Sequence, residues 1–263
     1  MTEASLPGFD RPVHAVVQGA SRGLGLAFVR HLLDDSNVAK VLATCRRPEH
    51  AGALQDLVDT SSGRVILAAV DVTDEESIAE AAAYARENLG EVHLLLNVAG
   101  VLHDKAREME PEKKLDDIDP DDLLYAFQVN SAGPLLMVKH FSSLIPRKGR
   151  AVIANLSARV GSIGDNRLGG WYAYRASKAA QNMFTRTVAI ELGRHRRRGE
   201  LICVALHPGT VDTDLSRPFQ SHVPDKKLFD PPRAARQLLD VIAELRPEDS
   251  GNFFDWAGEP VPW

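Results

Sequence analysis

The sequence predicts an α/β fold with a doubly wound parallel sheet of about seven strands flanked by helices. Short runs of β-branched residues alternate with longer stretches of helical periodicity, which is typical of parallel βαβ units with right-handed crossovers. A glycine-rich turn follows the first of these runs. No linker rich in proline, glycine and serine divides the 263 residues, so we expect one domain over positions 1–263.

The expected strands are short, mostly apolar runs of the kind that parallel sheets bury on both faces. They span residues 13–17, 38–44, 65–70, 92–96, 151–156, 201–206 and, as a short final strand, 252–254.

The expected helices have apolar residues spaced three or four positions apart. They span residues 23–33, 74–88, 123–144, 172–194 and 233–245. Thr73 or Asp74 is the expected N-cap of the second helix. The charged segment 103–122, which contains two prolines, is expected to be a surface excursion.

Composition excludes several classes of protein. The net charge of −5 indicates no nucleic-acid surface, and we read the basic run 194–198 as solvated cations at a helix end. No apolar run is long enough to span a membrane, and no secretory signal precedes the first strand. The two cysteines, Cys45 and Cys203, lie far apart, as suits a reducing compartment. The histidines lack metal-ligand spacing, so we expect a cytoplasmic protein without a metal site.

The turn after the first strand has the pattern Gly-x-x-x-Gly-x-Gly, formed by Gly19, Gly23 and Gly25. Glycines permit a tight turn and a close approach of the backbone to a pyrophosphate. The helix that follows presents unpaired N–H groups and a partial positive charge. The alternative, simple turn chemistry, is disfavoured because the turn lies between a strand and a helix. The pattern therefore predicts a dinucleotide site on a Rossmann fold.

The end of the second strand should select the dinucleotide. An NAD site carries Asp or Glu about twenty residues beyond the last glycine. Cys45 stands there instead, and Arg46 follows it. Arg46, with Arg22 from the glycine turn, can bind a 2′-phosphate, so NADP(H) is preferred to NAD(H). The alternative is that both arginines are solvated surface residues.

Tyr174 and Lys178 lie four residues apart on a predicted helix and therefore on one face of it. A phenol has a pKa of about 10, and lowering it to about 7 requires about 4 kcal/mol, which an adjacent ammonium can supply. Tyr172 is the rival phenol, but Ala176 stands four residues after it. Tyr174 is thus the predicted acid/base.

In this order the motifs resemble those of the short-chain dehydrogenase/reductase family. The matching motifs are Gly19-x-x-x-Gly23-x-Gly25, Asp71-Val72, Asn97-Val98-Ala99-Gly100, Asn130, Tyr174-x-x-x-Lys178 and Pro208-Gly209. The resemblance covers essentially the whole chain. The stretch 157–172 is more particularly similar to the C-factor group, which is close to the sniffer-type carbonyl reductases.

The resemblance implies a cofactor half at about residues 10–150, a catalytic and substrate half at about 151–263, and a role for each matching residue. Asp71 and Val72 would contact the adenine, and Asn130 would hold a water in a proton relay. Lys178 would also bind the nicotinamide ribose. The residues expected to contact NADP(H) are Gly19, Ser21, Arg22, Gly23, Leu24, Gly25, Arg46, Asp71, Val72, Asn97, Ala99, Gly100, Tyr174, Lys178, Pro208, Gly209, Val211 and Thr213.

Two positions depart from the family pattern. Val98 replaces a second Asn, a mild change. Ala158 stands where the family has its catalytic serine, so Ser157 or Ser162 is expected to orient the substrate carbonyl instead. The predicted catalytic residues are therefore Tyr174, Lys178, Asn130 and Ser157.

Two functions from different classes follow. The first is an NADP(H)-dependent oxidoreductase acting on a small carbonyl or alcohol substrate. The second is an NADP(H)-binding signalling or regulatory protein with little catalysis, which Ala158 and the similarity to the C-factor group favour. Substrate identity, reaction direction and the choice between monomer, homodimer and homotetramer stay open.

Overall fold

The computed structural model describes residues 6, 8, 9, 11–194 and 200–263; residues 195–198 of the basic run lie outside them. A seven-stranded sheet of order β3-β2-β1-β4-β5-β6-β9 forms the centre, and every pairing in it is parallel. The predicted fold is therefore confirmed. The strands are β1 Val13–Gln18, β2 Val38–Cys45, β3 Val65–Ala69, β4 Leu94–Asn97, β5 Arg150–Leu156, β6 Glu200–His207 and β9 Phe253–Asp255.

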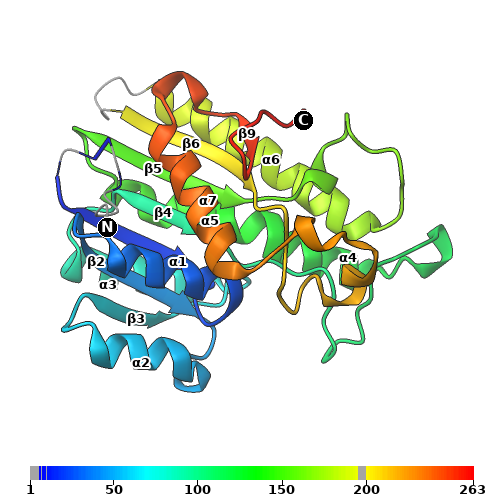
Figure 1. Ribbon diagram of the computed structural model, residues 1–263, viewed down its shortest axis with the longest axis horizontal. Coiled ribbons are helices and arrows are strands. Elements are labelled where there is room, and N and C mark those ends of the chain that lie inside the picture. The colour runs from blue at the N-terminus through cyan, green and yellow to red at the C-terminus, as the bar shows by residue number, and fades with distance from the viewer. Residues whose placement is uncertain (1–5, 7, 10, 195–199) are drawn as a thin grey trace.

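Helices cover both faces of the sheet (Figure 1). They are α1 Gly23–Asp34, α2 Gly52–Thr60, α3 Glu75–Asn88, α4 Pro120–Phe127, α5 Gly133–Phe141, α6 Tyr172–Gly193 and α7 Pro231–Glu244. Side chains alternate along each strand, so Ala15 and Val17 pack in the core beneath α1, α2 and α7. Val16 packs in the opposite core, with α3, α5 and α6. Burial on both faces explains the apolar runs in the sequence.

The strand order reverses between β1 and β4, and this switch point is where open α/β sheets bind ligands, beyond the carboxyl ends of the strands. The loops after β4, β5 and β6 gather at that edge (Figure 1). A small parallel pair, β7 Thr210–Val211 with β8 Leu228–Phe229, joins the ends of the segment that follows β6. Among the described residues, no helix has both the length and the apolar content to cross a bilayer.

Three local expectations differ from the structure. Sequence reasoning missed α2, a helix of nine residues in which Leu54 is the one fully buried side chain. The helix expected over 123–144 is present, but it contains an unpredicted π-helical turn, Gln128–Ala132, between α4 and α5 and beside Gly133 and Pro134. Helix α7 begins two residues earlier than expected. Asp74 caps α3 as predicted.

Candidate active site

Two adjoining pockets lie at the carboxyl edge of the sheet, with volumes of about 680 and 860 Å³. We call them the β2-side pocket, which Arg46 lines, and the β6-side pocket, which Tyr174 lines. Both volumes are in the usual range of small-molecule sites. The residues that line both pockets, here called the junction, are Gly19, Arg22, Ala99, Gly100, Asp214 and Arg217.

The glycine turn forms the floor of the junction. Gly19 has a φ of +85°, and a Cβ there would lie 2.7 Å from the Ala99 nitrogen. A Cβ on Gly25 would overlap the Gly19 carbonyl. Helix α1 starts without a side-chain cap and with no acidic residue in its first turn, so its N–H groups stay available to an anion. This cradle fits a pyrophosphate.

Besides the junction residues, four predicted cofactor residues line the β2-side pocket, namely Ser21, Arg46, Asp71 and Val72. The Asp71 carboxylate accepts hydrogen bonds from the backbone and hydroxyl of Thr73, which hold it in place. The pocket thus gathers residues that follow β1, β2 and β3.

Asn97 lies beneath the cleft and not in its wall. It is fully buried and lines neither pocket, and its amide donates to Asn155 Oδ1 at 2.7 Å. The bond joins β4 to β5. Its neighbours Ala99 and Gly100 line both pockets.

Tyr174 and Lys178 line the β6-side pocket from the first turns of α6. The Lys178 ammonium donates to Leu156 O at 2.7 Å and to Gln181 Oε1 at 2.9 Å, and lies 6.0 Å from the centre of the Tyr174 ring. Burial lowers the pKa of Lys178 to about 7. Burial raises the pKa of Tyr174. The lowering expected from the charges of Lys178 and a nicotinamide together stays a prediction. With this lowered pKa, Lys178 is only partly protonated at neutral pH and stabilises a phenolate less. Burial of the Tyr174 side chain also disfavours its charged form.

Asn130 lies in the π-helical turn, a distortion frequent at functional sites. Its side chain exchanges two 2.8 Å hydrogen bonds with the Val101 backbone, and it also donates to Ser177 Oγ. It lines neither pocket, but a Cβ on Gly100 would lie 3.2 Å from its Oδ1 and 3.6 Å from the Lys178 ammonium. Asn130 thus connects the loop after β4 to helix α6. The relay water stays a prediction.

Ser157 and Ala158 both line the β6-side pocket, whereas Ser162 does not. The Ser157 hydroxyl donates to Asn182 Oδ1 at 2.6 Å, and Ser162 Oγ accepts from the Asp165 backbone. Of the two candidate serines, the geometry favours Ser157.

The far wall of the β6-side pocket contains the predicted residues Gly23, Leu24, Gly25, Pro208, Gly209, Val211 and Thr213. Trp171 and Phe219 also line this pocket, and their rings pack 4.9 Å apart, with Trp171 against the Tyr174 ring. Trp171 adopts a left-handed conformation, with a φ of 52°. The two residues come from different loops, and only the folded chain brings their rings together.

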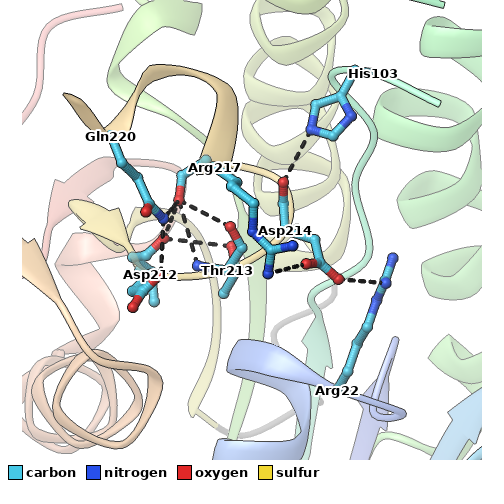
Figure 2. Close-up of polar contacts among 9 residues, drawn as sticks. Arg22, His103, Asp212, Thr213, Asp214, Arg217 and Gln220 are labelled. Carbon is cyan, nitrogen blue, oxygen red and sulfur yellow. Dashed lines mark hydrogen bonds and ion pairs between the residues drawn. The ribbon is translucent and has the colours of Figure 1, made fainter. Parts of the chain in front are cut away.

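A segment that we call the strap, residues 212–227, connects β7 to β8 across the junction. Figure 2 shows its Asp214 carboxylate between two guanidiniums, those of Arg22 and Arg217. His103, from the loop after β4, donates to the Asp214 carbonyl at 3.0 Å. Sequence reasoning also missed these contacts of Asp214 and Arg217.

A doubly wound sheet with a glycine turn at its switch point defines a nucleotide-binding α/β protein. Comparison with known proteins identifies the family. The model of the short chain dehydrogenase family matches residues 13–224, and the chain belongs to this family of oxidoreductases.

Two relatives illustrate the family's range. The chain is 39% identical over 152 residues to the C-signal of Myxococcus xanthus, covering 57% of this chain and 83% of that protein. It is 30% identical over 249 residues to a 1-hydroxy-2-glutathionyl-2-methyl-3-butene dehydrogenase of Rhodococcus sp. (strain AD45), covering 94% and 98% of the two chains.

Two solved structures are similar over nearly the whole chain. An NADPH-bound carbonyl reductase from chicken fatty liver is 34% identical with a TM-score of 0.85. The carbonyl reductase Sniffer of D. melanogaster is 28% identical with a TM-score of 0.83. Each match covers 96% of this chain and 100% of the other.

Proposed function

We propose that this protein is an NADP(H)-dependent oxidoreductase that interconverts a carbonyl and an alcohol, with Tyr174 as general acid/base. The observation that carries the proposal is the buried Tyr174–Lys178 pair in a pocket that adjoins the glycine turn. The cofactor, when bound, supplies the hydride. Likeness to an NADPH-bound carbonyl reductase supports the choice of cofactor and reaction.

Arg46 and Arg22 carry the preference for the phosphorylated dinucleotide. Both line the β2-side pocket, where a 2′-phosphate would lie beside the adenosine ribose. No carboxylate stands at Cys45 to hold the ribose hydroxyls of NAD. A guanidinium binds phosphate through charge-assisted, paired hydrogen bonds, so these residues fit NADP(H).

Tyr174 moves the proton. Because its pKa is raised, Tyr174 stays protonated at neutral pH and can donate its hydroxyl proton to the carbonyl oxygen of a bound substrate. In its protonated form, Lys178 stabilises the phenolate that this step leaves. We propose that the Ser157 hydroxyl turns from Asn182 toward the substrate and orients the substrate carbonyl. Ser157 would thus replace the serine that the family carries at position 158.

The test is turnover of a broad panel of aldehydes and ketones with NADPH. Tyr174→Phe is expected to lower kcat by about 10³-fold and leave NADPH affinity unchanged, because only the transferable proton is removed. Tyr172→Phe, the neighbouring phenol, is the matched control and should retain activity. Equal activity of wild type and Tyr174→Phe would contradict the assignment.

The second candidate is an NADP(H)-binding signalling or regulatory protein. Ala158 at the family's serine position and the 39% identity to the C-signal favour it. Tight NADPH binding without turnover of any panel member above the Tyr174→Phe background would support this function and reject the first.

We also propose a cytoplasmic location, which suits two buried cysteines, Cys45 and Cys203, that form no disulfide. A homodimer or homotetramer stays a prediction. The exposed apolar side chains of Met183 and Ile190 on α6 support it, and sedimentation of the purified protein tests it.

A further inference from the structure

The junction contains a cluster of three charged residues, of which only Arg22 has been given a role above. Asp214 accepts from Arg22 Nη1 at 2.7 Å and from Arg217 Nη2 at 2.7 Å (Figure 2). Arg22 belongs to the glycine turn, and Asp214 and Arg217 belong to the strap. The cluster therefore joins the floor of the cleft to its cover. Two cations and one anion leave a net charge of +1 there.

Stability of the fold does not account for this cluster. The side chains of both arginines are 75% exposed and that of Asp214 is 45% exposed. Ion pairs as exposed as these contribute about 0–1 kcal/mol. A guanidinium has several N–H donors, and the contact with Asp214 uses one from each arginine. The remaining donors can bind a second anion.

The position of the cluster indicates which anion that is. Its three residues all line both pockets, directly over the glycine turn. A dinucleotide with its adenosine in the β2-side pocket and its nicotinamide in the β6-side pocket must cross the junction with its pyrophosphate. The 2′-phosphate, in contrast, belongs to the adenosine end, where Arg46 lies.

We propose that Arg217 binds the cofactor pyrophosphate from the strap side, opposite the N-terminus of α1, with Asp214 holding its guanidinium beside Arg22. This inference rests on the proposed dinucleotide function. His103 and the β7–β8 pair hold the strap in place before the ligand arrives, which reduces the ordering cost of binding. Because NADPH and NADH share the pyrophosphate, Arg217 contributes equally to both, whereas Arg46 discriminates between them.

The experiment measures dissociation constants of NADPH, NADH and adenosine 2′-monophosphate, which lacks the pyrophosphate. Arg217→Ala should weaken NADPH and NADH by a similar factor of about tenfold and leave adenosine 2′-monophosphate unchanged. Arg46→Ala should show the complementary pattern, a loss for NADPH and adenosine 2′-monophosphate but not for NADH. Arg236→Ala, at an exposed position on α7, is the matched control and should change none.

Two results overturn the inference: unchanged affinity of Arg217→Ala for both dinucleotides, or a loss confined to NADPH and adenosine 2′-monophosphate. Thermal unfolding of Arg217→Ala, expected to match wild type, separates a lost contact from a lost fold. If wild type binds neither dinucleotide, the proposed function itself fails. If it binds both equally, only the phosphate preference fails, and Arg217 is still tested with NADH.

Discussion

The proposed cofactor half, about residues 10–150, and the proposed catalytic half, about residues 151–263, position their pocket residues differently. In the first, Gly19, Arg46 and Asp71 each follow directly or closely after a strand, so the parallel sheet itself brings them to one edge. In the second, Tyr174 stands on a helix and Arg217 on a strap, and contacts between distant segments position both. The first site follows from topology, whereas the second depends on individual tertiary contacts.

The largest expected effect concerns the glycine turn of the cofactor half. Gly25→Ala places a Cβ against the Gly19 carbonyl, where neither backbone segment can yield, so we expect loss of detectable NADPH binding and a lower melting temperature. Gly193→Ala is the matched control, because a Cβ there meets nothing within 4 Å. Unchanged affinity of Gly25→Ala in a binding titration would show that the turn does not form the cradle.

In the catalytic half, removal of the Ser157 hydroxyl should lower kcat. Ser157→Ala is expected to lower kcat on the order of 10²-fold, because the substrate carbonyl loses a hydrogen-bond donor. Ala158→Ser, which restores the family's serine, should raise kcat above wild type. The same substitution should restore the activity that Ser157→Ala removes when the two are combined. Full activity of Ser157→Ala in steady-state assays would reject Ser157 as the orienting group.

Burial of Lys178 gives the catalytic half a pH-dependent stability. The pKa of this amine is about 7 in the folded protein, against an ordinary value of 10.5 that applies once the chain is unfolded and the amine is solvated. Between these values the unfolded chain binds a proton that the folded protein has released, so the free energy of unfolding rises with pH.

We therefore expect wild type to gain about 2 kcal/mol relative to Lys178→Met between pH 7 and pH 9. Denaturant unfolding of both proteins at the two pH values measures it. A difference that is constant or shrinks with pH would mean that Lys178 keeps its proton in the folded state.

The smallest expected effect concerns the start of α6. Trp171 supplies no side-chain cap, and the buried Glu112 carboxylate accepts from the Ala173 N–H at 3.1 Å instead. Glu112→Ala should lower the free energy of unfolding by about 1 kcal/mol and reduce kcat, because Tyr174 follows in the same turn. Glu112→Gln retains an acceptor and should lose less; equal losses in the two variants would argue against a capping role.

Much of the candidate site was predictable because its motifs are local. The glycine turn, Arg46 after β2 and the four-residue spacing of Tyr174 and Lys178 each occupy one short stretch of sequence. The π-helical turn between α4 and α5 was not predicted, although Gly133 and Pro134 lie beside it, since apolar periodicity continues across the turn. Burial raises the pKa of Tyr174, and sequence reasoning did not anticipate this effect, because burial is a property of the packed protein.

The sequence by itself determined the strand–helix alternation, the sheet edge that carries the site and the residue types that reach it. Those features follow from periodicity and backbone sterics over a few residues. Only the tertiary structure decided that Glu112 caps α6, and that Asp214 joins Arg22, which lies 192 positions away, to the strap. Such contacts depend on where loops meet after the sheet has formed, and no local spacing specifies that.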